Sequence, residues 1–215
     1  MISLTRVSVE YGDKVKPLDD VSHTFLAGTT AVTGPSGSGK STLLRLIAGV
    51  QSPKAGTVAI DGEPVGRASW FSAGDPRVSV IYQDHRLVPF LTVAQNLSLA
   101  VESRGAKSSA DQAEAALARV GLPSSTSHRF PGSMSSGEQQ RVAVARALAV
   151  GSPVLVADEP TGALDAENTA RITDVLLELG QSGDLTVIVA THDMSVAERM
   201  DQRIGLGAGR LLVAA

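Results

Sequence analysis

Residues 34–42 of the chain read Gly34-Pro35-Ser36-Gly37-Ser38-Gly39-Lys40-Ser41-Thr42. They contain G-x-x-x-x-G-K-[ST], the pattern of a phosphate-binding loop. Glycines let the backbone take conformations that are closed to residues with a Cβ, so that successive N–H groups can turn inward on a phosphate chain. Lys40, expected at the surface of the loop, would place its charge between the terminal phosphates, and the Ser41 hydroxyl would bind an accompanying Mg²⁺. We predict that residues 34–42 bind a nucleotide.

The residues on either side of the loop are in the order that such a loop requires. Residues 30–33 are typical of a short buried strand, and residues 40–48 have the apolar spacing of a helix. The start of that helix would add the positive end of its dipole to the phosphate site. The alternative is a glycine- and serine-rich turn that only caps a helix, and the flanking strand and helix favour the phosphate-binding interpretation.

The composition limits what the chain can be. Its 215 residues are enough for one α/β core, with room for a smaller subdomain. A net charge of −3 gives no basic field of the kind that non-specific nucleic-acid binding needs, so no nucleic-acid partner is expected. The absence of cysteine excludes disulfides and thiol chemistry. No apolar run is long enough to span a bilayer and no signal peptide is evident, so we expect a cytosolic chain.

Short apolar segments predict an α/β fold with two sheets. Hydrophobic residues make up 43% of the chain but aromatic residues only 3%, which suits buried parallel strands of Val, Leu, Ile and Ala. The candidates for a mainly parallel sheet are 30–33, 78–82, 153–157, 185–190 and a short strand near the C-terminus. The candidates for an N-terminal antiparallel sheet, with turns at Gly12-Asp13 and Asp61-Gly62, are 2–9, 21–26 and 57–60.

Between residues 84 and 150 the pattern is helical. Residues 92–104 and 108–120 have the helical spacing of apolar residues, and a third helix is predicted over 138–149. We interpret residues 84–150 as a helical subdomain that is inserted into the α/β core, with the whole chain, 1–215, forming a single domain.

Polar residues follow two of the predicted parallel strands at the point where each strand ends. Ligands of such sheets bind outside the carboxyl ends of the strands. Gln83 could therefore reach the Mg²⁺ or the attacking water, although a polar residue that merely opens a loop explains it as well. Asp158 and Glu159 are costly together unless a cation or solvent meets them. We predict that Asp158 faces the Mg²⁺ and that Glu159 polarises the water that attacks the γ-phosphate; the alternative is two acids at a solvated turn.

Three further residues have two interpretations each. His192 follows the strand predicted over 185–190, and it could hydrogen-bond the γ-phosphate and hold the water, or be an ordinary loop residue. Tyr11 could stack on a purine or simply pack at a strand edge. Asp165 is a natural N-cap for a helix over 166–179, and capping could be its whole role.

A second segment with a helix start is Met134-Ser135-Ser136-Gly137-Glu138-Gln139, which leads into the helix predicted over 138–149. Ser135 and Glu138 form the S-x-x-E pattern of a capping box, which gives a complete structural account of these two residues. Capping leaves Gly137, beside two serines, unexplained. This helix start is a second candidate for binding phosphate.

Together these segments resemble the ATP-binding-cassette (ABC) ATPases over essentially the whole chain. The phosphate loop with Asp158 and Glu159 would indicate only a P-loop NTPase. The match becomes specific through residues 135–139, preceded by Gln83 and followed by Asp165 and His192 in the family's order and spacing. The motifs look most like those of the macrolide-exporter and lipoprotein-releasing branch.

The resemblance implies an ABC ATPase fold with ATP and Mg²⁺ as cofactors. It implies that Tyr11 stacks on adenine, that Gln83 is the Q-loop glutamine, and that Asp165 and His192 are the D-loop aspartate and the switch histidine. The signature, residues 134–138, would close over ATP that is bound to a second ATPase subunit in a homo- or heterodimer. The family's signature has two glycines after its serine, and Ser136 replaces the first, so we expect a working but slower site.

The function that the resemblance implies is the ATPase subunit of a membrane transporter. Such a subunit lies on the cytoplasmic face of the membrane and drives a permease on a separate chain, which would dock at residues 84–91. A related version transmits force to envelope enzymes, as cell-division ABC ATPases do. The alternative from another class is a soluble ABC protein, of which an iron–sulfur assembly ATPase is the hardest to exclude.

Overall fold

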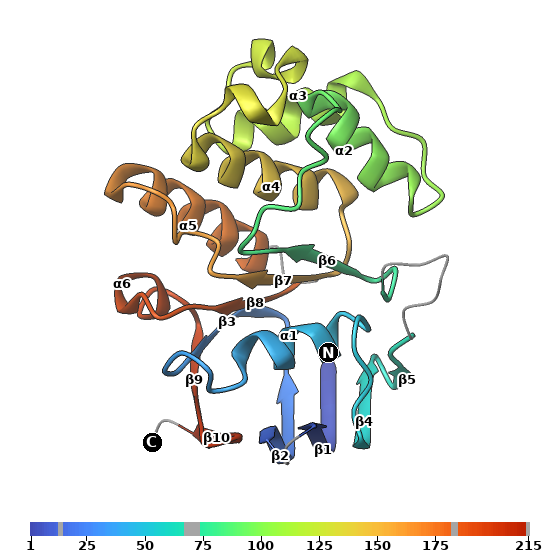
Figure 1. Ribbon diagram of the computed structural model, residues 1–215, viewed down its shortest axis with the longest axis vertical. Coiled ribbons are helices and arrows are strands. Elements are labelled where there is room, and N and C mark those ends of the chain that lie inside the picture. Colours follow the sequence, from blue (N-terminus) through green and yellow to red (C-terminus); the bar gives the residue numbers. More distant parts are fainter. Residues whose placement is uncertain (13–14, 67–73, 182–184, 214–215) are drawn as a thin grey trace.

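The computed structural model describes residues 1–12, 15–66, 74–181 and 185–213, and it consists of two sheets with helices between and above them (Figure 1). The first sheet has the order β2-β1-β4-β5 and the second has the order β10-β9-β3-β8-β7-β6. The strands of the first sheet are β1 (Ile2–Tyr11), β2 (Val15–Phe25), β4 (Ala55–Ile60) and β5 (Glu63–Pro64). The strands of the second sheet are β3 (Gly28–Thr33), β6 (Val78–Ile81), β7 (Val154–Asp158), β8 (Thr186–Ala190), β9 (Gln202–Gly207) and β10 (Arg210–Val213).

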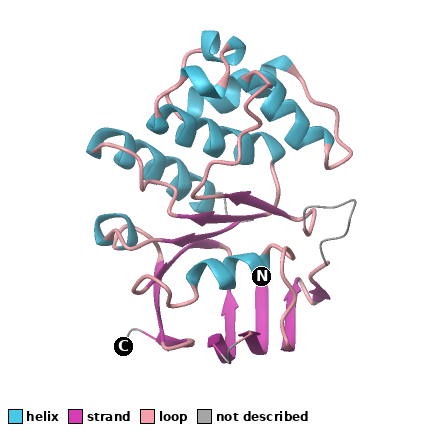
Figure 2. Ribbon diagram, viewed as in Figure 1, coloured by secondary structure: helices cyan, strands magenta, loops and turns pink. Residues whose placement is uncertain are grey.

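The helices cover the second sheet on both faces. The α-helices are α1 (Lys40–Ile47), α2 (Val93–Glu102), α3 (Ala110–Arg119), α4 (Ser136–Val150), α5 (Ala166–Gln181) and α6 (Met194–Ala197). Short 3₁₀ turns lie at Ser124–His128 and Pro131–Ser133. Figure 2 shows that α2 to α5 lie on one side of the second sheet, whereas α1 lies between this sheet and the antiparallel one. None of the helices in the described ranges is both long and apolar enough to cross a bilayer.

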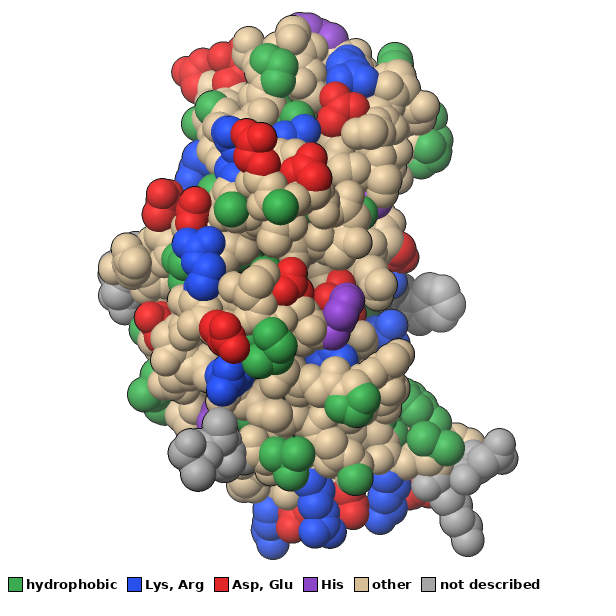
Figure 3. All heavy atoms as spheres, turned by 90° about the vertical axis from the view of Figure 1, so that its left-hand side faces the viewer, with side chains coloured by type: hydrophobic (Ala, Val, Ile, Leu, Met, Phe, Trp, Pro, Cys, Tyr) green, Lys and Arg blue, Asp and Glu red, His purple; other side chains and the backbone are tan. Residues whose placement is uncertain are grey.

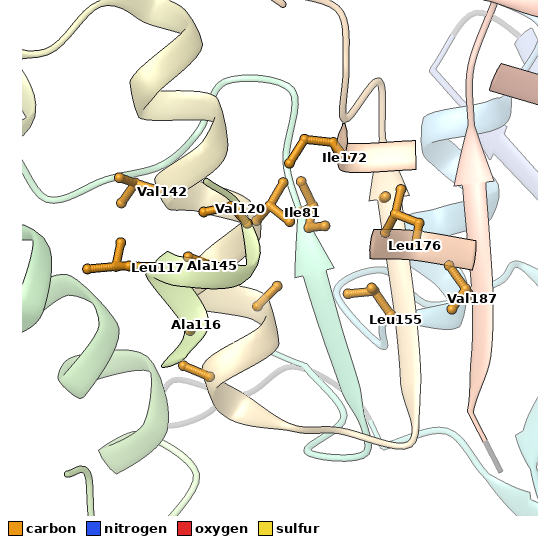
Figure 4. Close-up of a cluster of buried hydrophobic side chains, with 14 of the residues drawn as sticks. Ile81, Ala116, Leu117, Val120, Val142, Ala145, Leu155, Ile172, Leu176 and Val187 are labelled. Atoms are coloured by element: carbon orange, nitrogen blue, oxygen red, sulfur yellow. The ribbon is translucent and has the colours of Figure 1, made fainter. Parts of the chain in front are cut away.

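The two faces of the second sheet belong to two hydrophobic cores, which explains why its central strands β7 and β8 are almost entirely apolar. Along β7, Leu155 and Ala157 face the core under the helices, where Leu176 also lies (Figure 4). Val154 and Val156 alternate with them and face the core around α1 and the antiparallel sheet. Both faces of the sheet are thus buried at β7, so that a site in this part of the sheet must lie at the ends of the strands.

The fold class predicted from the sequence is confirmed. Strands β3, β6, β7, β8 and β9 pair in parallel, and the N-terminal sheet is antiparallel. The Asp61-Gly62 turn is found, with φ values of 51° and 82° that match a tight hairpin. Of the turn predicted at Gly12-Asp13, Asp13 lies outside the described residues.

The prediction of one C-terminal strand is incomplete, because the structure has two. Strand β9 turns back on itself at Ala208 and Gly209, with φ values of 48° and 74°, and pairs with β10 in an antiparallel hairpin. Two successive residues in the left-handed region are what a two-residue hairpin requires. The strand predicted over 21–26 is likewise too short, since β2 begins at Val15.

Candidate active site

A cleft of about 660 Å³ lies at the carboxyl ends of β3 and β7, beside the start of α1. Its walls come from segments that are far apart in the sequence. They include Tyr11, Val15, Pro17, residues 34–42, Gln83, Asp158, Glu159 and His192. The structure therefore brings together most of the site residues that the sequence predicts.

The loop between β3 and α1 needs glycine at two positions because other backbone segments approach it closely. A Cβ on Gly34 would lie 2.2 Å from the carbonyl oxygen of Leu206, and one on Gly39 would lie 2.3 Å from that of Pro17. Gly39 is the N-cap of α1 and makes no side-chain capping hydrogen bond. Ser38 Oγ is buried without a hydrogen-bond partner among the described residues. The loop therefore leaves polar groups free for an anion, and a turn that only caps α1 does not explain it.

Lys40 departs from the expectation that it lies at the surface of the loop. The residue is only 9% exposed, and Nζ donates to the carbonyl oxygens of Gly34, at 2.8 Å, and Pro35, at 3.2 Å. An ammonium group that leaves water needs hydrogen-bond acceptors, and the loop carbonyls supply them. Lys40 still lines the cleft, so its positive charge lies at the wall where we expect phosphate to bind.

Three oxygen-bearing side chains could hold a metal ion in the cleft. Ser41 lies in the first turn of α1, Gln83 follows β6, and Asp158 ends β7; all three line the cleft and also an adjoining hollow of about 480 Å³. Hydroxyl, amide and carboxylate oxygens suit Mg²⁺, which is usually bound by one or two carboxylates together with phosphates and waters. In the described ranges no group of three or more His, Cys, Asp or Glu could hold a metal by itself. The donor set fits a magnesium ion that is shared with a phosphate chain.

Glu159 is held in place by contacts from the loop after β8. His192 Nδ1 lies 2.8 Å from Glu159 Oε1, and the buried Thr191 donates to Glu159 Oε2 at 3.3 Å. The Glu159 side chain is 12% exposed, whereas that of His192 is 75% exposed. The hydrogen bond to Glu159, reinforced by the carboxylate charge, raises the pKa of His192. Glu159 also has a φ of 49°, a strained value that occurs at functional sites.

Tyr11 lies at the rim of the cleft. Its hydroxyl donates to Gln51 Oε1 at 2.9 Å and lies 3.5 Å from Thr42 Oγ1, which tethers the ring beside the loop. The residue is 43% exposed, and it pairs across the hairpin with Val15. Both interpretations of Tyr11 agree with this place, so stacking on a purine stays a prediction.

The second predicted helix start lies away from the cleft. The capping box is confirmed: Glu138 N donates to Ser135 Oγ at 3.2 Å, and Ser135 N donates to Glu138 Oε2 at 2.8 Å. The backbone hydrogen bond from Ser135 and the neighbouring Arg129 guanidinium, 2.7 Å away, lower the pKa of Glu138. Ser136 is exposed, and Gly137 lies against residues 163–164. None of these residues lines the cleft of the same chain.

The capping role of Asp165 is confirmed, and it is part of a larger network. Asn168 N donates to Asp165 Oδ1 at 2.8 Å, and this backbone hydrogen bond is the main cause that lowers the pKa of Asp165. Arg141 from α4 donates to Asn168 Oδ1 at 2.6 Å. From the sequence no role is predicted for Arg141, Asn168 or Thr191, because the contacts of Arg141 with Asn168 and of Thr191 with Glu159 join distant parts of the chain.

Comparison with known proteins agrees with this geometry. Residues 18–162 match the sequence profile of the family described as ABC transporter. The chain is 39% identical over 201 residues to the lipoprotein-releasing system ATP-binding protein LolD of Nitrobacter winogradskyi, covering 91% of this chain and 86% of the relative. It is 40% identical over 219 residues to the methionine import ATP-binding protein MetN of Caulobacter vibrioides, covering 99% of this chain and 66% of the relative.

Two solved structures have nearly the same fold. The dimeric structure of MJ0796, a bacterial ABC transporter cassette, has a TM-score of 0.88 and 33% identity, and the match covers 98% of this chain and 96% of that one. The post-hydrolysis dimer of the same cassette, bound to ADP and Pi, also has a TM-score of 0.88, with 32% identity and the same coverage.

Proposed function

The chain belongs to the ABC transporter family as an ATP-binding cassette that hydrolyses ATP, and we propose that it works as one of two cassettes that close around two ATP molecules. The observation that carries the proposal is that the site is divided. The cleft holds residues 34–42, Gln83, Asp158, Glu159 and His192, whereas the exposed helix start at residues 135–137 lies outside it. A second cassette would bring its own residues 135–137 to the open side of the cleft.

Each residue of the cleft then has a role. Lys40 and the N–H groups at the start of α1 bind the phosphates. Ser41, Gln83 and Asp158 would hold the Mg²⁺, which when bound would offset charge on the phosphate oxygens. Glu159, oriented by Thr191 and His192, takes the proton of the attacking water. Tyr11 supports the adenine ring.

The permease would meet the surface next to Gln83. The hollow of about 480 Å³ and a groove of about 490 Å³ both have Tyr82 and Arg86 in their walls. Phe90, in the loop that follows, is 77% exposed. We propose that this surface of a helical subdomain, residues 84–150 of a single domain, receives a permease at the cytoplasmic face of the membrane.

The lipoprotein-releasing branch is the proposed place of the chain within the family. The motifs of this chain look like those of that branch, and several similar relatives are LolD proteins. Purifying the tagged chain from detergent-solubilised membranes and identifying its co-purifying permease tests this assignment. A permease related to the lipoprotein-releasing system is expected, and an importer permease such as that of a methionine transporter would contradict it.

The dimer is tested by blocking hydrolysis. Glu159→Gln keeps the shape of the side chain but removes the base, so ATP that glues two cassettes together is not consumed. We expect this variant to elute as a dimer from a sizing column with ATP and Mg²⁺ and as a monomer without nucleotide. Wild type should show little dimer under the same conditions.

The matched control adds Ser135→Arg to Glu159→Gln. Ser135 lies outside the cleft, so the double variant should still bind ATP as a monomer but should no longer dimerise. Dimerisation of the double variant to the same extent would overturn the proposed role of residues 135–137. Hydrolysis by Glu159→Gln at the wild-type rate would overturn the role of Glu159.

A further inference from the structure

The loop that follows Gln83 contains two consecutive non-glycine residues in the left-handed region of the backbone. His85 has a φ of 57° and Arg86 has a φ of 49°. Such residues persist only where the surrounding structure fixes them, and they cluster at functional sites. Within the loop, the Arg86 guanidinium lies 3.9 Å from the centre of the Tyr82 ring, and its Nε donates to Asp84 Oδ1 at 3.1 Å. These contacts are local and exposed, so they do not tie the loop to the rest of the protein.

Two helices hold the loop: Asn96 of α2 accepts a hydrogen bond from Val88 N at 2.7 Å, and Arg146 of α4 binds residues nearer to the start of the loop. The Arg146 guanidinium donates to the carbonyl oxygens of the two left-handed residues, to His85 at 2.7 Å and also to Arg86. Burial lowers the pKa of Arg146, as expected for a cation whose hydrogen bonds go to neutral carbonyls. One side chain of the helical layer thus fixes both strained residues.

Arg104, which follows α2, makes the same kind of contact at the other end of β6. It donates to the carbonyl oxygens of Asp75 and Val78, both at 2.9 Å. The helical layer therefore holds β6 and its flanks at two points through two arginines. Only the Arg146 contact lies close to Gln83.

Gln83 depends on this support because its own side chain has none. It is exposed, and in the described part of the chain no hydrogen bond restrains its amide. Its place in the wall of the cleft, with Ser41 and Asp158, is therefore set by its backbone. The backbone is anchored by β6 on one side and by the residues that Arg146 holds on the other.

We propose that Arg146 is a positioning residue, which fixes the backbone at His85 and Arg86 and thereby keeps Gln83 at the metal side of the cleft. The inference rests on the proposed role of Gln83 in holding Mg²⁺. Without the Arg146 guanidinium, the two carbonyls lose their donor and the strained pair relaxes, which moves Gln83 away from Ser41 and Asp158.

The test compares Arg146→Met with Arg104→Met. Both substitutions keep an apolar stem and remove two hydrogen bonds to backbone carbonyls, but at opposite ends of β6. The first readout is hydrogen exchange of the nucleotide-free protein. Arg146→Met should speed exchange of the amides at residues 83–87, and Arg104→Met should leave them at the wild-type rate. Equal exchange of these amides in wild type and Arg146→Met would overturn the inference.

The second readout is the Mg²⁺ concentration at half-maximal binding of a fluorescent ATP analogue, measured in the Glu159→Gln background. Outer-shell partners of metal ligands typically change metal affinity by about 10–100-fold, so Arg146→Met should raise this concentration about tenfold. Arg104→Met should change it less than about twofold, because the contacts that it removes lie at the end of β6 away from Gln83. Because Arg146 acts through Gln83, adding Arg146→Met to Gln83→Ala should cause no further rise.

The two proposals fail differently. No effect of Gln83→Ala on the Mg²⁺ requirement would remove the proposed role of Gln83. Two results would remove the role of Arg146 alone. In the first, Gln83→Ala raises the Mg²⁺ requirement but Arg146→Met does not. In the second, both substitutions raise it and their effects add up in the double variant. Should Arg146→Met not fold, Arg146→Lys decides the matter, since it keeps the charge but cannot bond both carbonyls in the same geometry. It must shift the Mg²⁺ requirement in the same direction, and no shift would overturn the inference.

Discussion

The loop at residues 34–42 and the helix start at residues 135–137 are the two regions that we propose to bind phosphate, and they differ in structure. Gly34 and Gly39 of the loop pack closely against the backbone of other segments, and Gly39, the N-cap of α1, provides no side-chain cap. The start of α4 is exposed and carries a complete capping box. The first region is packed against other segments of the chain at both of these glycines, whereas in the second region Ser135 and Ser136 are exposed to solvent.

The difference shows how one chain can hold two half-sites. In an uncapped helix the first N–H groups remain available, as in the loop beside Lys40. In α4 the capping box pairs the N–H groups of Ser135 and Glu138, and within the described residues those of Ser136 and Gly137 keep no partner. The cap thus orients the helix start without occupying the donors next to Gly137.

Lys40→Ala should have the largest effect on ATPase activity, because it removes the positive charge of the loop at residues 34–42. The loss of ATPase activity should be about 10²-fold or more, by analogy with the removal of a preorganised donor to a developing charge. The matched control is Lys54→Ala. Lys54 lies at the surface and pairs with Glu10 at 2.6 Å, so its loss should leave turnover near wild type.

The carbonyls of Gly34 and Pro35 lose their donor in Lys40→Ala, so the fold must be checked by circular dichroism and thermal melting. A folded Lys40→Ala protein with wild-type turnover would contradict the role of the loop. The same result would also leave the comparison of residues 34–42 with residues 135–137 without a basis, because no measurement would then link residues 34–42 to phosphate.

Much of the fold and of the cleft can be predicted from the sequence, because the evidence is local there. The glycines, Lys40 and the carboxylates at 158 and 159 stand at fixed offsets from strand ends. Contacts between distant segments give no such signal. The Thr191 hydroxyl on Glu159 and the Arg146 guanidinium on the loop after Gln83 depend on how strands and helices meet.

The prediction that Lys40 lies at the surface was wrong for a related reason. A lysine in a loop is usually exposed, but this side chain bends back onto the carbonyls of its own loop. The second C-terminal strand was missed because Gly209 allows a hairpin within a segment that has a weak strand pattern.

The contact between His192 and Glu159 allows a pH-dependent test, which measures how much this pair of residues in the cleft stabilises the protein. The pKa of His192 is raised above 6.5, mainly by the hydrogen bond and charge of Glu159, with Asp193 adding to the effect and Lys40 opposing it. The pairing therefore contributes its full stability below pH 6.5 and loses it as the pH rises through the pKa of folded His192.

An NMR titration of the His192 ring should give a lower midpoint in Glu159→Gln than in wild type. The stability difference between the two proteins, measured by urea unfolding, should shrink from acidic to alkaline pH. Identical midpoints in both proteins would show that the pairing does not form in solution.

Ser136→Gly should have the smallest effect, and it bears on the exposed half-site alone. Ser136 is the first residue of α4, beside Gly137, so its side chain occupies the surface that would face the phosphates of a partner cassette. Removing it should raise turnover by about twofold, which is a change of under about 0.5 kcal/mol. Glycine is also a poorer helix former than serine, by about 0.5 kcal/mol or less at this first position of the helix, so turnover should rise while the melting temperature falls slightly. Affinity for ATP in the isolated monomer should stay at the wild-type value, because Ser136 does not line the cleft of its own chain. A rise in monomer affinity would show that the two half-sites are not separate, and a fall in turnover would show that the Ser136 hydroxyl contributes to the closed site.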